Sequence, residues 1–167
     1  MLQLQSAELT DVGMIKNICD DARRFQQSQG FEQWPVGYPS TDVIATDIAS
    51  NKGYLILVDG DIVGYCVIDL NGDSEYNLKR DVWQSHEPYA AVHRLALSAD
   101  ARGKRLGLPI LKIIEDCVAN RGIRVIKVDT GLENIRMQRL LTSAGYSCRG
   151  QHHFSWGPRL AYEKVIE

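Results

Sequence analysis

The chain has 167 residues, of which 44% are hydrophobic and 24% are charged. These are ordinary values for a globular protein, and this length can bury a core without disulfides or metals. We therefore expect one domain over residues 1–167. The formal net charge of −2 excludes the strongly basic surface that nucleic-acid-binding domains carry.

The ends, apolar runs and cysteines carry no special signal. The N-terminal stretch MLQLQSAEL lacks the basic region and long apolar run of a secretory signal, and runs such as YLILV are too short to span a bilayer. The cysteines are scattered without a CxxC pair, which favours free thiols and gives no support for a zinc site. We expect a cytoplasmic protein that uses no metal and binds neither membrane nor nucleic acid.

Periodicity and turn residues divide the first part of the chain. A strand alternates over 2–5, and Thr10 or Asp11 caps a helix whose apolar residues recur at helical spacing up to Gly30. The segment FEQWPVGYPS that follows is predicted as a loop, because its prolines and Gly37 oppose regular structure.

The middle of the chain predicts a helix, a hairpin and a polar loop. Thr41 or Asp42 caps a second helix that runs towards Gly53. The stretch YLILVDGDIVGYCVIDL is typical of a hairpin with the Asp-Gly pair at 59–60 as its turn. The segment 71–89 is polar and is predicted as a loop.

The second half of the chain alternates strands and helices. The predicted elements are a strand over 90–98, a basic loop over 101–107, a helix over 108–120, a strand over 123–130, a helix ended by Gly145, and closing strands over 146–153 and 159–165. The order β-α-α-β-β-β-α-β-α-β-β predicts an α/β fold with a mixed sheet and helices on both faces.

The basic loop between strand and helix has two interpretations. It contains Arg102, Gly103, Lys104, Arg105, Leu106 and Gly107. One interpretation is a solvated connection with helix-starting glycines, which the loop taken alone favours. The other is a phosphate site, because a helix N-terminus presents unpaired N–H groups and the positive end of the helix dipole.

A second motif lies downstream and joins the basic loop in one resemblance. The stretch VDTGLENIRMQRLLTSAGY is a strand end, an asparagine at 134 and a short helix closed by Gly145-Tyr146. With the loop and the element order, it resembles the GNAT superfamily of acyl-CoA N-acyltransferases over most of the chain. The resemblance implies the GNAT fold, a central mixed sheet of six to seven strands with helices on both faces, and acetyl-CoA as co-substrate.

The resemblance also implies where coenzyme A binds. In that family two neighbouring parallel strands splay apart, the pantetheine arm lies between them, and loop amides hold the pyrophosphate. The corresponding residues here are Leu95, Leu97, Arg102, Gly103, Lys104, Arg105, Leu106, Gly107 and Asn134. Arg105 stands where a glycine is usual, and its side chain disfavours φ > 0. Asn134 could equally be a plain helix N-cap.

The chemistry implied is direct attack of a neutral amine on a thioester, which needs a base to deprotonate an ammonium. His93 is our first candidate, because it lies on the central strand and imidazole titrates near neutral pH. Alternation places His93 on the face of Ala91 and Leu95. The alternative is a structural histidine. Leu141 occupies the position of the tyrosine that often protonates the leaving thiolate in the family.

Four further residues are candidates for the acceptor end of the site. Glu75 is a second candidate catalytic group, or else an exposed loop residue, and Tyr76 beside it is a candidate for substrate binding. Trp34 and Tyr38 either wall the acceptor pocket or plug the core beneath the loop.

The sequence thus predicts an N-acetyltransferase that moves an acetyl group from acetyl-CoA to a primary amine of a small molecule or peptide. The alternative is a non-catalytic coenzyme A-binding or regulatory module, which Arg105 and Leu141 favour. The acceptor itself is set by loops that vary on one scaffold. A homodimer is a further expectation, drawn from family habit alone.

Overall fold

The computed structural model describes residues 1–167 and contains one 7-stranded sheet. The strands lie in the order β1-β2-β3-β4-β5-β7-β6. Their bounds are β1 Leu2–Ser6, β2 Gly53–Val58, β3 Asp61–Asp69, β4 Tyr89–Leu97, β5 Val125–Thr130, β6 Ser147–Phe154 and β7 Gly157–Val165. Only β4 and β5 run parallel, and all other neighbours are antiparallel, so the sheet is mixed as predicted.

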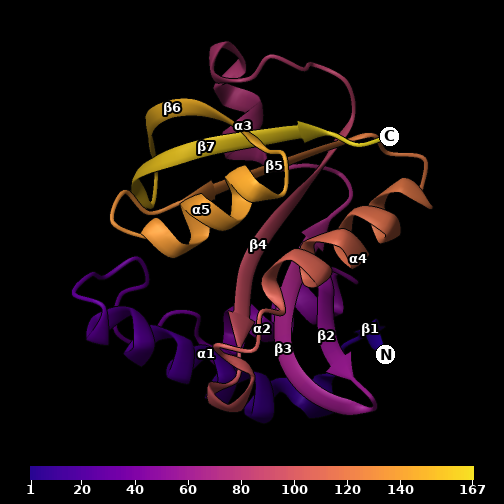
Figure 1. Cartoon of the computed structure of the whole chain (residues 1–167), viewed down its shortest axis with the longest axis vertical. Coiled ribbons are helices and arrows are strands. Elements are labelled where there is room, and N and C mark those ends of the chain that lie inside the picture. Colours follow the sequence, from indigo (N-terminus) through magenta and orange to yellow (C-terminus); the bar gives the residue numbers. More distant parts are fainter.

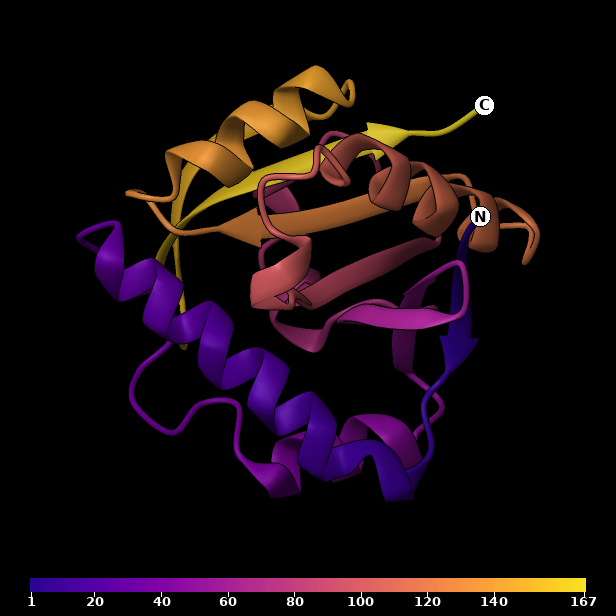
Figure 2. The same cartoon turned by 60° about the horizontal axis from the view of Figure 1, so that its bottom comes forward.

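Helices cover both faces of this sheet (Figure 1). Their bounds are α1 Val12–Ser28, α2 Thr41–Ala49, α3 Ser74–Leu78, α4 Gly107–Ala119 and α5 Ile135–Ser143. In Figure 2, α1 and α2 lie on one side of the sheet and α4 and α5 on the other. The predicted α/β fold with helices on both faces is confirmed.

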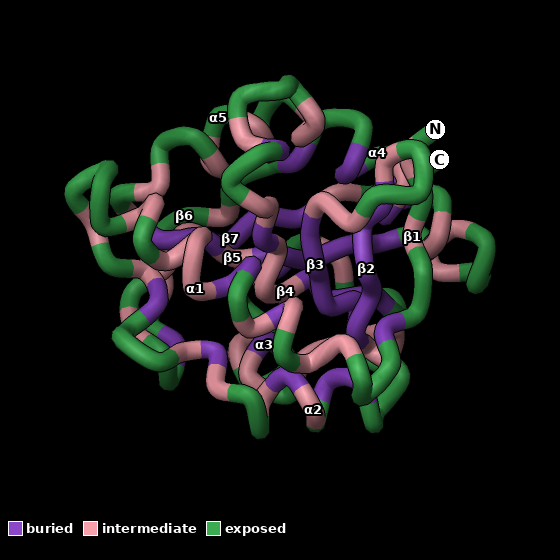
Figure 3. Tube along the Cα trace, turned by 90° about the horizontal axis from the view of Figure 1, so that it is seen from below, coloured by how far each residue is buried: buried purple, intermediate pink, exposed green.

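Each face of the sheet buries its own hydrophobic core. One cluster of 16 buried residues includes Ile110 and Ile114 of α4 and Ile126 of β5. Another cluster of 12 includes Ile15 of α1 and Ile44 of α2. Figure 3 shows burial along the central strands and exposure at the turns. Removal of this apolar surface from water, at about 25 cal/mol per Å², is the main force that fixes the sheet between its helices.

β4 and β5 pair over only part of their length. The paired residues are Tyr89 with Val125, Ala90 with Ile126 and Ala91 with Lys127. Beyond these pairs the two strands separate, and Figure 1 shows β4 diverging from β5 towards the lower part of the molecule. The sheet therefore has an opening between the C-terminal ends of its two parallel strands.

A bulge interrupts β4 beside this opening. Between the pairs Tyr65–Ala96 and Val67–His93, β4 has one residue more than β3. Arg94 has a φ of +50° at this point, a left-handed conformation that is uncommon for a residue with a side chain. An extra residue of this kind bends a strand and re-aims its side chains.

The bulge makes one sequence prediction wrong. Strict alternation places Leu95 on the face of Ala91 and His93, but Leu95 packs against the cluster on the α4 side. Ala91 belongs instead to the cluster around Tyr76, and the rings of Tyr76 and His93 lie 5.6 Å apart. Because side chains alternate with a period of two, one inserted residue moves everything after it to the opposite face.

Segment 71–89 is not the loop that the sequence predicts. It contains α3 and a 3-10 turn at Arg80–Val82. Asp73 caps α3, since its Oδ1 accepts the backbone N–H groups of Glu75 at 2.7 Å and Tyr76 at 3.3 Å. A helix of only 5 residues has too little periodicity to be recognised from the sequence.

The ends of α2 also differ from the prediction. The side chain of Ser40 accepts the N–H of Val43 at 3.1 Å, so the cap lies one residue before Thr41. The helix ends at Ala49, and Gly53 begins β2 rather than closing the helix.

Candidate active site

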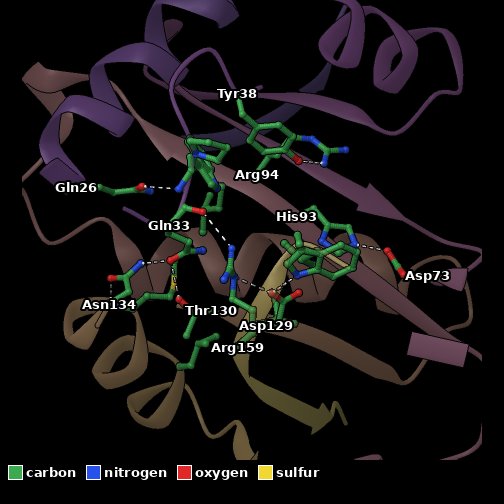
Figure 4. A pocket seen from close by; sticks show the side chains of 18 of the residues that line it. Gln26, Gln33, Tyr38, Asp73, His93, Arg94, Asp129, Thr130, Asn134 and Arg159 are labelled. Atoms are coloured by element: carbon green, nitrogen blue, oxygen red, sulfur yellow. Dashed lines mark hydrogen bonds and ion pairs between the residues drawn. The ribbon is translucent and has the colours of Figure 1, made fainter. Parts of the chain in front are cut away.

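A cavity of about 430 Å³ opens where β4 and β5 separate (Figure 4). Its lining comes from these two strands, from α1, α4 and α5, from the loop before α2, from the segment before α3, and from the turn between β6 and β7 with the start of β7. Val92, Leu95 and Val128 give it apolar walls, whereas Asp73 and Asp129 contribute carboxylates. A pocket of this size and mixed lining is typical of small-molecule sites.

His93 lines this cavity and is paired with Asp73. Its Nε2 lies 2.9 Å from Asp73 Oδ2, and both side chains are largely buried. Burial alone would raise the pKa of Asp73. The hydrogen bond and charge of His93, with the N–H groups of Tyr76 and Glu75, outweigh burial and hold that pKa below its usual value. The imidazole therefore faces an ionised carboxylate.

Tyr76 and Glu75 lie outside the cavity lining. Tyr76 is buried beneath the rings of His93 and Trp156, and its hydroxyl donates to Asp129. Burial raises the pKa of Tyr76 well above its usual value. Glu75 turns away, and its Oε1 accepts the N–H of Ser155 at 2.9 Å. The structure thus brings His93 and Tyr76 together, with Tyr76 as the packing surface.

The turn between β6 and β7 and the start of β7 supply two residues that the sequence reasoning missed. The Nε1 of Trp156 donates to Asp129 Oδ2 at 3.1 Å, and the Nε of Arg159 lies 3.7 Å from the same oxygen. Both side chains line the cavity. The sequence signal for this part of the site is the tryptophan at a hairpin turn, because its apolar ring needs a partner surface.

Arg94 connects the bulge to the loop before α2. Its guanidinium donates to both carboxylate oxygens of Asp47 in α2, at 2.8 and 2.5 Å, and to the Tyr38 hydroxyl at 2.9 Å. Trp34 packs edge-on against Tyr38, with ring centroids 6.3 Å apart. Both rings line the cavity, and Trp34 also belongs to the core on the α1 side. Trp34 therefore contributes both to the wall of the cavity and to the hydrophobic core.

Asn134 lines the same cavity and is hydrogen-bonded to Gln33. Asn134 Oδ1 accepts the N–H of Met137 at 3.2 Å and caps α5, while its Nδ2 donates to Gln33 Oε1 at 3.0 Å. The same Gln33 oxygen accepts the N–H of Gly131 at 3.0 Å and the hydroxyl of Thr130 at 3.4 Å. One side chain from the loop before α2 therefore occupies three donors beside the opening. Figure 4 shows this contact.

The basic loop retains glycine-like backbone conformations. Gly103 has a φ of +80° and Arg105 a φ of +57°. Arg105 therefore adopts the left-handed conformation despite its side chain, at a cost of about 1–2 kcal/mol. Arg102 is held from both sides, since it donates to the Leu97 carbonyl at 2.9 Å and its guanidinium lies 4.8 Å from the Phe25 ring centroid.

The other residues predicted for coenzyme A fall into two groups. Lys104 is exposed, as Arg105 is, while Leu97 and Leu106 pack against the core on the α4 side. Gly107 begins α4, and a Cβ there would lie 2.7 Å from Leu140 Cδ1. The glycine thus permits α4 and α5 to approach closely at the base of the loop.

Leu141 is buried in the core and also lines the cavity. We expect Leu141→Ala to lower the free energy of unfolding by about 2–5 kcal/mol, because truncation of a fully buried leucine leaves a void in the core. Urea denaturation measures the loss. Ile135→Ala on the same helix is the control, because Ile135 is 48% exposed and should change stability by only about 0.5 kcal/mol. Equal losses for the two variants would contradict the buried position of Leu141.

The structure contains neither a metal-ligand cluster nor a membrane-spanning helix. No group of three or more His, Cys, Asp and Glu side chains is arranged to hold a metal ion. None of the helices combines the length and hydrophobicity needed to cross a membrane.

Similarity to known proteins agrees with this architecture. The family model described as "Acetyltransferase (GNAT) family" matches residues 18–146. A GNAT-family acetyltransferase from Streptococcus agalactiae is 25% identical with a TM-score of 0.86, over 99% of this chain and 96% of that chain. One from Listeria monocytogenes is 20% identical with a TM-score of 0.76, over 99% and 95%.

A third solved structure has a more specific description. The aminoglycoside acetyltransferase AAC(6')-Ib, in complex with coenzyme A, is 16% identical with a TM-score of 0.73, over 99% of this chain and 95% of that chain. None of the curated proteins compared with the chain matches it significantly. The family match spans well over half of the chain and the fold agrees throughout, and the chain therefore belongs to the GNAT family of acetyltransferases.

Proposed function

We propose that residues 1–167 act as one domain that transfers the acetyl group of acetyl-CoA to a primary amine of a small molecule or peptide. The observation that carries the proposal is the cavity between β4 and β5, which brings a histidine and an asparagine to one opening. Family membership supports the acyl donor, and the aminoglycoside acetyltransferase of similar fold was solved with coenzyme A.

The opening suits the pantetheine arm of coenzyme A. Beyond the Ala91–Lys127 pair, β4 has no partner from β5, so its backbone groups on this edge, apart from the Leu97 carbonyl that Arg102 contacts, can pair with the amides of the arm as a strand would. Leu111 and Val128 provide apolar sides for the methylene groups. We assign Leu95, Leu97 and Asn134 to this part of the cofactor.

The basic loop suits the pyrophosphate. It leads into α4, a helix of 13 residues, so the loop lies at the positive end of a full helix dipole. The exposed side chains of Lys104 and Arg105 add cations there, and charge-assisted hydrogen bonds to phosphate are strong. We assign the segment 102–107 to the pyrophosphate.

His93 is the proposed general base. A primary amine resembles lysine, with a pKa of about 10.4, and is mostly protonated at neutral pH. The ammonium gives one proton to His93, which passes it to water. The C–N bond forms as the C–S bond breaks, and a second proton from nitrogen neutralises the departing thiolate. Because Leu141 cannot donate a proton, this second transfer is left to water.

The acceptor is proposed to bind between the loop before α2 and the turn between β6 and β7. Trp34, Tyr38 and Trp156 form aromatic walls there. The carboxylates of Asp73 and Asp129 line the same cavity and can accept hydrogen bonds from an ammonium group, and the guanidinium groups of Arg94 and Arg159 line it as well.

Removal of the Gln33 side chain tests the proposed role of Asn134. We expect Gln33→Ala to bind coenzyme A about 2–10-fold more tightly, because the cofactor arm would no longer compete for Asn134 and Gly131, and each net hydrogen bond contributes about 0.5–1.5 kcal/mol. Isothermal titration calorimetry measures this change.

The matched control for Gln33 is Gln26→Ala. Gln26 Oε1 accepts the N–H of Trp34 at 3.2 Å, so it steadies the same loop without touching Asn134. Its loss should leave the affinity for coenzyme A close to that of the unmodified protein. Weaker binding in Gln33→Ala would show that Gln33 forms part of the cofactor site instead of competing for it.

An acceptor panel tests the proposed function itself. The protein is incubated with acetyl-CoA and polyamines, amino acids, aminoglycosides or peptides, and release of the coenzyme A thiol is followed. Thiol release with an amine, together with an acetylated product seen by mass spectrometry, supports the proposal. Tight binding of acetyl-CoA with no release for any amine would favour the non-catalytic module instead.

A further inference from the structure

The contact between Asp73 and His93 carries one further assignment. His93 Nε2 lies 2.9 Å from Asp73 Oδ2, at the edge of the cavity. We propose that Asp73 is a positioning residue that holds His93 in the tautomer protonated on Nε2, so that Nδ1 is the nitrogen left to accept a proton. The assignment rests on the proposed function for the role of His93 as base, whereas the tautomer itself is a separate, measurable property.

The backbone of Asp73 is held in place before its side chain reaches His93. Gly72 has a φ of +80°, and a Cβ there would lie 2.7 Å from the ring of Tyr89. This close approach brings the Tyr89 hydroxyl to both backbone groups of Asp73: the hydroxyl accepts the N–H at 3.0 Å and lies 2.9 Å from the carbonyl oxygen. Tyr89 and His93 both belong to β4, so Asp73 is fixed relative to the strand that carries the base.

The two oxygens of the Asp73 carboxylate have different partners. Oδ1 accepts the N–H groups of Glu75 and Tyr76 and caps α3, while Oδ2 faces His93. Rotation of the carboxylate away from the imidazole would break the cap, which contributes about 0.5–2 kcal/mol. An ionised carboxylate only accepts hydrogen bonds, so the ring nitrogen that faces it must carry the proton.

No other group near the ring competes for this arrangement. Tyr76 of α3 packs on the imidazole, but its hydroxyl donates to Asp129 of β5. Arg94, the next residue of β4, is engaged by Asp47 of α2. The side-chain hydrogen bonds of His93 involve Nε2 alone. Neutral imidazole with hydrogen on Nε2 has its lone pair on Nδ1, so Nδ1 is the nitrogen that can accept a proton.

The tautomer can be measured by NMR without any substrate. Long-range nitrogen–proton spectra of protein with isotope-labelled histidine distinguish the two neutral forms, and His93→Gln assigns the signal. We expect the unmodified protein to show hydrogen on Nε2. In Asp73→Asn the side-chain amide can donate to Nε2, so we expect the hydrogen to move to Nδ1. Asparagine is as good an N-cap as aspartate, which preserves α3.

The outcomes separate this assignment from the proposed function. Hydrogen on Nε2 in the unmodified protein and its transfer in Asp73→Asn support it, provided the backbone amide signals of α3 stay in place. Hydrogen on Nδ1 in the unmodified protein, which requires no variant to observe, overturns it. An unchanged tautomer in a folded Asp73→Asn also overturns it. The absence of turnover with every amine would overturn the proposed function and leave the tautomer result standing.

Discussion

His93→Ala should lower kcat/KM for an amine acceptor by about 10²–10⁴-fold, the usual contribution of a positioned general base. The reason is that the acceptor is protonated at neutral pH and His93 is the imidazole that lines the cavity. A pH series of kcat/KM measures the effect. The profile of the unmodified enzyme should rise with pH and bend where the base titrates, and this bend should be missing in the variant.

His93→Gln separates basicity from packing. Glutamine retains a side-chain N–H that can reach Asp73, but it is not a base in this pH range. We expect it to lose activity as His93→Ala does. Coenzyme A affinity should change little in either variant, because His93 lines the cavity, whereas no residue of the basic loop does. If His93→Ala keeps the kcat/KM of the unmodified enzyme and the bend in its pH profile, measured with an amine that the unmodified enzyme acetylates, His93 is structural.

Gly103→Asp should weaken coenzyme A binding by about tenfold or more relative to Gly103→Asn. A carboxylate in the basic loop repels the pyrophosphate, and two charges near a protein surface interact by several kcal/mol at about 4 Å. Gly103 is the appropriate position because a Cβ there meets no atom within 4 Å. At Gly107 the same change would collide with Leu140.

Aspartate and asparagine form a matched pair at position 103. Gly103 has a φ of +80°, and both residues tolerate left-handed conformations better than other side chains do. They therefore share the backbone strain and differ in charge. Calorimetric titration at rising salt should shrink the difference, because screening weakens exposed charges. Equal affinities for coenzyme A in the two variants would show that the pyrophosphate does not bind at this loop.

The sequence predicts the features that depend on local patterns. Asn134 caps α5, which is the alternative that its position before a helix allows, and the basic loop lies between β4 and α4 as its strand-to-helix pattern indicates. These predictions succeed because capping and hydrophobic periodicity involve residues a few positions apart.

The rest of the site comes from contacts between distant residues. Asp73 and His93 are 20 positions apart, and Gln33 and Asn134 are 101 positions apart. No local pattern joins such residues, because the sheet alone brings them together. The bulge at Arg94 is equally hidden, since the stretch AAVHRLALS has no glycine to indicate a left-handed residue. This bulge determines which side chains of β4 lie on the same face of the sheet as His93 and which lie on the face covered by α4.

A crystal structure of the protein with coenzyme A tests the central claim most directly. We expect the pantetheine arm between Val92–Leu97 and Val128–Thr130, the pyrophosphate on the segment 102–107, and Asn134 bonded to the arm with the Gln33 side chain displaced. The thiol should then end near His93. Coenzyme A bound elsewhere on the protein, or an arm that leaves the opening between β4 and β5 empty, would contradict the account.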